Sequence, residues 1–238
     1  MQFSTLSIVM PCYNEAQTLR HVVDKVLAAD TSGLRHELII VDDGSRDDSA
    51  QIARTIATER NNVRVIEHGV NLGKGAALRT GFQAADGDIV LVQDADLEYN
   101  PDDYSKLLKP ILDGRADVVY GSRFRSGDEM RVLYFWHSLG NRMLTLMSNM
   151  LTDLNLTDME TCYKLFVRDV VKSIRIEENR FGFEPEITAK IAHMQSRPRI
   201  YEVGISYSGR TYAEGKKIGW RDGLRAVWCI LKYNLRRG

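Results

Sequence analysis

The stretch DIVLVQDADLE (residues 88–98) joins a short aliphatic run to a group of carboxylates. The run from Ile89 to Val92 is typical of a buried strand in an α/β sheet. Asp94, Asp96 and Glu98 follow directly where that strand ends. Ligands of open α/β sheets bind at the carboxyl ends of the strands. This one stretch therefore predicts a fold class and the place of a binding site.

Similar aliphatic runs occur along the first half of the chain and alternate with helical patterns. The other predicted strands are LSIVM (6–10), ELIIV (37–41), VRVIE (63–67) and ADVVY (116–120). Helices are expected at 47–60, 75–85 and 101–112, with an earlier one reaching about residue 28 after a capping box at Asn14 and Gln17. This alternation predicts an α/β fold with a mostly parallel sheet flanked by helices. Helices at 131–153, 168–175 and 184–194 and a strand at 199–206 follow.

The composition excludes several classes of protein. The chain has 238 residues, 44% of them hydrophobic, and its 32 basic and 32 acidic residues cancel. Such a chain can bury a full core, which argues against global disorder, and without a basic excess we expect no nucleic-acid partner. The three cysteines are far apart, so neither a disulfide framework nor a cysteine metal site is expected, and a reducing cytoplasm is the simplest compartment.

The acidic turn after residue 92 is the strongest single feature. Asp94 and Asp96 offer hard oxygen ligands of the kind that Mg²⁺ or Mn²⁺ prefers, and Glu98 could supply a third. The alternative is a solvated acidic turn, since two aspartates at this spacing are common in proteins.

Polar residues also follow the other predicted strands. Asp42 and Asp43 either form a turn before the next helix or hold a ribose or base. The glycine-rich segment NLGKG (71–75) matches neither a Walker loop nor a dinucleotide fingerprint, but it presents Lys74 near a helix N-terminus as an anion contact.

With these motifs assembled, the sequence resembles the family-two glycosyltransferases of the GT-A fold. More narrowly, it is similar to the polyprenyl-phosphate glycosyltransferases, which include the dolichol-phosphate mannose synthases. The motifs that carry this resemblance are PCYNE (11–15), VDDGS (41–45), NLGKGAAL (71–78), DADLE (94–98), GSRF (121–124), DMETCYK (158–164) and GRTYAEGKKIGW (209–220).

The resemblance implies a role for individual residues. The nucleotide would be held by Pro11, Tyr13, Glu15, Asp42 and Asp43. The metal and diphosphate would be held by the turn Asp94, Ala95, Asp96 and Glu98, the last being a position where the family often has Gln. The acceptor phosphate would meet Arg123 and a second arginine, Arg142. Arg210 and Lys216 match basic residues of a loop that closes over the donor, and the catalytic residues would be Asp96, Arg123 and Arg210.

The expected reaction moves a sugar, with inversion, from a nucleoside diphosphate sugar to a polyprenyl monophosphate. GDP-mannose and UDP-hexoses both fit as donors. Two alternatives stay open: a family-two transferase that uses a sugar hydroxyl, with Glu160 or Asp158 as base, and a non-catalytic nucleotide-sugar or membrane-binding module. The expected organisation is a nucleotide-sugar-binding core at 1–125, an acceptor-side region with the closing loop at 126–215, and a basic amphipathic helix at 216–238.

The zero net charge conceals two poles. Residues 86–117 contain nine carboxylates and three basic residues, whereas residues 216–238 contain seven basic residues and one carboxylate. The basic end is interleaved with aromatic and aliphatic residues, which favours an amphipathic helix on an anionic membrane surface. Residues 132–136 are a possible second contact, with core packing as the alternative, and no stretch is expected to span a membrane. We therefore expect a peripheral protein on the cytoplasmic face, of the subtype without membrane spans, and a homo-oligomer is compatible with the sequence.

Overall fold

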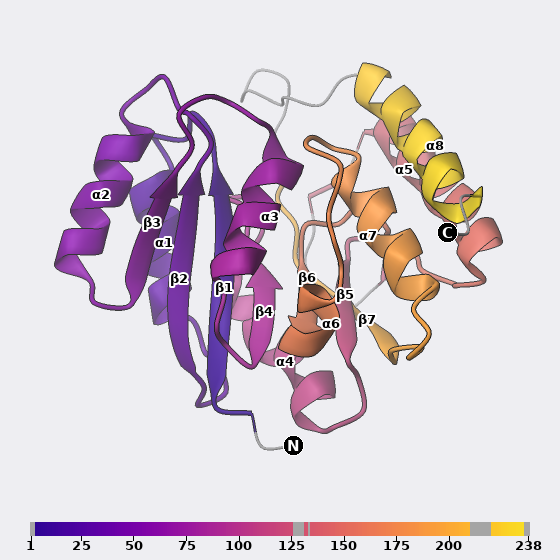
Figure 1. Ribbon diagram of the computed structural model, residues 1–238, viewed down its shortest axis with the longest axis horizontal. Helices are drawn as coiled ribbons and strands as arrows, with labels where there is room; N and C mark the ends of the chain where they lie inside the picture. Colours follow the sequence, from indigo (N-terminus) through magenta and orange to yellow (C-terminus); the bar gives the residue numbers. More distant parts are fainter. Residues whose placement is uncertain (1–2, 126–130, 133, 210–219, 236–238) are drawn as a thin grey trace.

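The protein is built around one seven-stranded sheet with the strand order β3-β2-β1-β4-β6-β5-β7 (Figure 1). We describe residues 3–125, 131, 132, 134–209 and 220–235 of a computed structural model, without the side chains of residues 220 and 221. The strands are β1 (Thr5–Cys12), β2 (Arg35–Asp42), β3 (Val63–Glu67), β4 (Ile89–Val92), β5 (Val118–Ser122), β6 (Lys164–Val167) and β7 (Ile200–Gly204).

The predicted fold class is confirmed. All six predicted strands are present, five of them from apolar runs and the sixth from the region 199–206, and the pairs β1–β2, β2–β3, β1–β4 and β5–β7 are parallel. The strand β6 was not predicted, and it runs antiparallel to both β4 and β5. Its sequence, KLFV, has only four residues and begins with a lysine, so its pattern cannot be distinguished from that of a loop. Lys164 is buried by tertiary packing, which a local pattern does not reveal.

Helices cover both faces of the sheet. They are α1 (Leu19–Ala28), α2 (Ser49–Glu59), α3 (Lys74–Ala84), a 3₁₀ turn (Pro101–Asp103) that leads into α4 (Tyr104–Leu112), α5 (Phe135–Thr152), α6 (Arg168–Lys172), α7 (Phe183–Ala192) and α8 (Trp220–Leu235). Figure 1 shows α2 at one end of the molecule and the adjacent helices α5 and α8 at the other.

The core forms where the aliphatic strands meet the apolar faces of the helices. Leu6, Ile8 and Met10 of β1 are fully buried, as are the four residues of β4. Burying each such side chain contributes about 2 kcal/mol before entropy is counted. Because β1 and β4 lie side by side, this burial fixes the two loops that follow them next to each other.

The outer helices α5 and α8 keep much of their apolar surface exposed. The exposed residues are three or four positions apart along α8, as are Met143, Leu146 and Met150 on α5, so they form stripes. We call these two stripes the apolar strip; its residues are Phe135, Trp136, Met143, Leu146 and Met150 on α5 and Leu224, Trp228, Leu231 and Leu235 on α8. In the part of the chain that the structure describes, no helix is long and apolar enough to cross a membrane.

Candidate functional site

The loops after β1 and β2 are tied together by side chains. The backbone N–H of Asn14 donates to Ser45 Oγ at 3.0 Å, and the N–H of Glu15 donates to Ser49 Oγ at 2.8 Å. Asn14 adopts a left-handed backbone (φ 53°), and its side chain accepts from the N–H of Arg46 at 2.8 Å. The predicted capping box is therefore wrong: α1 begins later, at Leu19, because Asn14 is used to join the two loops.

The two aspartates after β2 have different surroundings. Asp43 is buried and accepts from the His68 ring, from the Asn71 amide and from the N–H groups of Leu72 and Gly73 at 2.6–3.0 Å. Its carboxylate thus positions the glycine-rich loop. Asp42 is also buried and accepts from Ser45 through Oδ2, but its Oδ1 has no partner. An unpartnered buried acceptor is costly, so Asp42 is the better placed of the two to take a donor from a ligand.

The glycine-rich loop delivers Lys74 to the acidic turn. Lys74 Nζ lies 2.9 Å from one Asp94 oxygen and 3.0 Å from the other, and 3.5 Å from Glu184. Burial acts to lower the pKa of Lys74, but the charges of Asp94 and Glu184 outweigh burial and raise the pKa well above its usual value. Gly73 is required here, because its φ is 105° and a Cβ would lie 2.4 Å from the Asn179 carbonyl oxygen.

The rest of the acidic turn is anchored by hydrogen bonds. Asp96 is only 8% exposed, and its Oδ1 accepts a hydrogen bond from the backbone N–H of Glu98 at 3.1 Å. Glu98 accepts from the Tyr207 hydroxyl at 2.7 Å, and the carbonyl of Ala95 accepts from Thr18 at 3.1 Å. These contacts hold the turn in one shape at the edge of β4.

The acidic turn offers oxygen ligands of the chemical type that a hard divalent cation prefers. Asp94 and Asp96 present carboxylate oxygens two residues apart at one strand end. Among the described residues, no group of three His, Cys, Asp or Glu side chains is arranged to hold a metal ion. Lys74 already neutralises Asp94, so a cation there shares that carboxylate with the ammonium group.

Arg123, at the end of β5, is locked to Asp158. Its Nε and Nη2 donate to the two Asp158 oxygens at 2.7 and 2.8 Å, and its backbone N–H donates at 3.0 Å. Asp158 is fully buried and also accepts from Asn141 at 3.0 Å. Burial acts to raise the pKa of Asp158, but Arg123 outweighs burial and lowers it. The guanidinium stacks over the Tyr207 ring at 5.2 Å and is only 14% exposed, so little of Arg123 reaches the surface.

The remaining predicted residues are spread around this edge. Pro11 is the last but one residue of β1, and Tyr13 and Glu15 are half-buried in the loop after it. The Arg142 guanidinium stacks over the ring of Phe124, 5.3 Å from its centroid, and Phe124 is the residue that follows Arg123. Arg210 and Lys216 lie outside the described residues.

Several residues of the site were missed by sequence reasoning. Glu184, on the first turn of α7, contacts Lys74 from 110 positions away in sequence, and Asn141 reaches Asp158 from α5. No local spacing could have found these contacts, because each joins two separate elements of the fold.

A cavity of about 650 Å³ lies beside the site. It is bounded by Leu72 of the glycine-rich loop, by residues 177–181 and by α8. Glu178, only 5% exposed, accepts from Arg225 at 2.6 Å and from Lys232 at 3.0 Å there. Two of the basic residues expected to face a membrane therefore pair with the protein itself. These cations outweigh burial and lower the pKa of Glu178 to about 2.

The chain is similar to known proteins whose names include a polyprenyl or dolichol phosphate. The chain is 28% identical over 217 residues to undecaprenyl-phosphate 4-deoxy-4-formamido-L-arabinose transferase of Proteus mirabilis. This match covers 90% of the chain and 63% of the relative. It is 26% identical over 230 residues to dolichol-phosphate mannosyltransferase of Pyrococcus furiosus, covering 96% of this chain and 64% of that one. The chain thus spans less than two thirds of the length of these curated relatives.

Solved structures share the fold. Glucosyl-3-phosphoglycerate synthase from Mycobacterium tuberculosis, in complex with Mn²⁺, UDP and glucosyl-3-phosphoglycerate, superposes with a TM-score of 0.74 at 22% identity, covering 97% of this chain and 80% of that one. The family model of glycosyl transferase family 2 matches residues 7–175, which include most of β1, all of β2 to β6 and the acidic turn. The chain belongs to glycosyl transferase family 2.

Proposed function

We propose that this protein transfers a sugar from a nucleoside diphosphate sugar to a polyprenyl monophosphate at a membrane surface. The observation that carries the proposal is the occurrence, on one chain, of the acidic strand edge and the exposed apolar strip. The first suits a nucleotide donor, and the second suits a lipid acceptor. The names of the relatives support the same pair of substrates.

The donor side uses the loops after β1, β2 and β4. Asp42 offers its unpartnered oxygen to the nucleotide, beside Pro11, Tyr13 and Glu15, while Asp43 holds the glycine-rich loop. Asp94 and Asp96, with Glu98 beside them, would hold Mg²⁺ or Mn²⁺, and the Mn²⁺ of the structural neighbour supports this choice. A divalent cation there would neutralise the diphosphate leaving group. Lys74 supplies a further positive charge at the same place.

The acceptor side uses the arginines after β5. A phosphate monoester is already ionised near neutral pH, so its oxygen can attack the anomeric carbon without a strong base. The new bond joins that oxygen to the anomeric carbon, the bond to the diphosphate breaks, and the configuration inverts. Asp158 holds Arg123 in one orientation, and Arg142 offers a second guanidinium nearby. Arginine suits phosphate recognition because it can donate two parallel hydrogen bonds.

The apolar strip supports membrane attachment. Trp136 is 77% exposed, Met150 76% and Trp228 57%, on two neighbouring helices. Exposed apolar patches of this extent mark interaction surfaces, and amphipathic helices with aromatic residues bind membrane interfaces. We place the protein on the cytoplasmic face, where anionic lipids attract basic residues.

A transferase that uses a hydroxyl acceptor is the second candidate. It needs a base, and Asp158 is a poor one because both of its oxygens accept from Arg123. Burial, together with the nearby Glu184, raises the pKa of Glu160 to about 8, which suits a general base near neutral pH.

An acceptor panel separates the two candidates. The protein is incubated with UDP-glucose or GDP-mannose, with Mg²⁺ or Mn²⁺, and with undecaprenyl phosphate in vesicles, free phosphoglycerate, or no acceptor. Released nucleoside diphosphate is measured. We expect release above the no-acceptor rate with the lipid phosphate alone. Release with phosphoglycerate alone would replace this proposal with the second candidate.

A further inference from the structure

Three buried side-chain oxygens in the region next to the acidic turn have no hydrogen-bond partners. They are Glu160 Oε1, Thr161 Oγ1 and Glu184 Oε2. Glu184 is 4% exposed and Thr161 is fully buried. Leaving a buried polar atom unpaired costs about 1–3 kcal/mol, so three in one region need an explanation.

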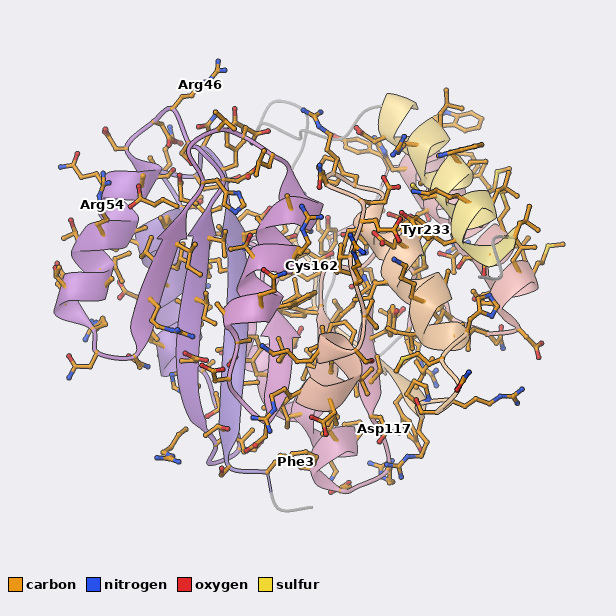
Figure 2. All side chains as sticks on the ribbon, viewed as in Figure 1. Phe3, Arg46, Arg54, Asp117, Cys162 and Tyr233 are labelled. Atoms are coloured by element: carbon orange, nitrogen blue, oxygen red, sulfur yellow. The ribbon has the colours of Figure 1, made fainter. Side chains whose placement is uncertain are left out.

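Two of these oxygens belong to a segment that joins the donor and acceptor sides of the site. At one end, Asp158 holds Arg123. At the other, Cys162 lies against β4, with its Sγ 3.9 Å from the Val92 carbonyl oxygen. Figure 2 shows Cys162 near the middle of the molecule, between the α3 side and the α7 side. Glu160 and Thr161 therefore lie between the acidic turn and the acceptor arginine.

The third oxygen approaches the same region from α7. Lys74 connects Glu184 to Asp94, so the Glu184 carboxylate lies directly next to the acidic turn. Lys164 is fully buried, its ammonium group donates to the Thr161 carbonyl, and it interacts electrostatically with both Glu160 and Glu184. Lys164 thus lies next to the two carboxylates, while one side-chain oxygen of each of the three residues has no hydrogen-bond partner.

We infer that the unpartnered oxygens of Glu160, Thr161 and Glu184 form the subsite that receives the hydroxyl groups of the donor sugar. The inference rests on the proposed function, which places the transferred sugar between diphosphate and acceptor phosphate. Carboxylate oxygens repel phosphate but accept from hydroxyl groups, and a threonine hydroxyl both donates and accepts. A hexose is the part of the donor that carries several hydroxyl groups and no charge.

Glu160 is half-buried, and Lys74 and Asp94, which lie next to Glu184, are 18% and 20% exposed, so this region reaches the surface. A bound diphosphate attracts the Lys74 ammonium away from Glu184 and so frees both oxygens of that carboxylate. The charged groups around Glu160 are Glu184 on α7, Lys164 on β6, Arg123 after β5 and Asp158 in its own segment. Burial, then Glu184, raises the pKa of Glu160 to about 8, so its carboxyl group can donate as well as accept near neutral pH.

The test compares a nucleotide with its own sugar conjugate. Isothermal titration calorimetry in the presence of Mn²⁺ gives the dissociation constants of UDP, UDP-glucose, GDP and GDP-mannose. The nucleotide and nucleotide sugar that the wild-type protein binds are then used with the variants. For Thr161→Val and Glu160→Leu, which remove the hydrogen-bonding atoms, we expect the nucleotide sugar to bind at least tenfold more weakly and the free nucleotide to bind within twofold of wild type.

Two matched variants control for packing. Thr161→Ser keeps the hydroxyl and is expected to restore sugar binding. Ser148→Ala removes another buried, unpartnered hydroxyl, on α5, and is expected to leave both constants unchanged. Equal weakening of the nucleotide and its sugar conjugate, or no weakening of either, would overturn the subsite and identify the oxygens as sites for internal water. A wild-type protein that binds no nucleotide sugar would overturn the proposed function itself.

Discussion

Arg123 and Asp158 form a two-pronged ion pair in which the carboxylate is fully buried, with N–O distances of 2.7 and 2.8 Å. The pair joins the end of β5 to the segment before β6, two elements 35 residues apart. A phosphate-binding arginine on a surface loop has many rotamers, whereas this one has its orientation fixed in advance. Asp158 thus fixes the orientation of Arg123, the residue that we propose meets the acceptor phosphate.

Replacing Asp158 with Asn should destabilise the protein strongly. The change leaves the largely buried Arg123 guanidinium without a countercharge, which costs about 3–5 kcal/mol. Urea denaturation measures this loss. Asp117→Asn is the matched control, because it breaks a similar pair with Arg199, 56% exposed, at the other end of β5 (Figure 2), and should cost less than about 1 kcal/mol. Equal losses in the two variants would show that the Arg123 pair is not buried in solution.

Replacing Asp94 or Asp96 with Asn should remove metal-dependent turnover, by about 100-fold or more. Each change deletes a charged oxygen from the donor set next to Lys74. Released nucleoside diphosphate, measured across a Mn²⁺ titration, checks the effect. Asp113→Asn is the control, since Asp113 belongs to the same acidic region but pairs with Arg115 on the surface. Full metal-dependent turnover in both site variants would remove the acidic turn from the mechanism.

The stability of the protein should depend on Glu160 between about pH 5 and 8. Its pKa is about 8 in the folded state and 4.5 in the reference state, so between these values the folded chain holds a proton that the unfolded chain has released. The free energy of unfolding therefore falls as pH rises through this range, on the order of 2 kcal/mol. In Glu160→Gln this contribution is absent. Thermal unfolding of both proteins at pH 5, 6.5 and 8 measures the difference, and parallel pH profiles would contradict the burial of this carboxyl group.

Placing a charge in the apolar strip should weaken membrane binding. Trp136→Glu and Trp228→Glu each put a carboxylate in place of an exposed aromatic side chain that we propose meets the lipid interface, and we expect roughly tenfold weaker partitioning. Flotation with anionic phosphatidylglycerol vesicles measures it. Tyr201→Glu, on β7 and 38% exposed, is the control outside the strip. If all three variants floated like wild type, the strip would not be the membrane contact.

The sequence predicted the frame of the molecule better than its connections. The runs that became β1, β2, β4 and β5 were recognisable because their aliphatic residues are consecutive, and these residues are buried on both faces of the sheet. The strand β6 was missed because Lys164 interrupts its apolar pattern, and that lysine is buried only through contacts with distant residues.

The same limit applies to the site. Asp42, Asp94 and Asp96 follow strand ends and could be singled out from local patterns alone. The pairing of Arg123 with Asp158, and of Lys74 with Glu184, joins residues from different elements and required the fold. Asn14 shows the reverse case, in which a local helix-capping pattern was overridden by a bond to the next loop.

The most direct test of the central claim is the mass of the lipid product. Wild-type protein is incubated with Mn²⁺, with undecaprenyl phosphate in vesicles and with the nucleotide sugar that it binds. The mass of the extracted lipid is measured by mass spectrometry, and the released nucleoside diphosphate is quantified. We predict a lipid heavier by one sugar residue, formed in a one-to-one ratio with nucleoside diphosphate and absent with Asp94→Asn. Nucleoside diphosphate released without a sugar-bearing lipid would contradict the claim.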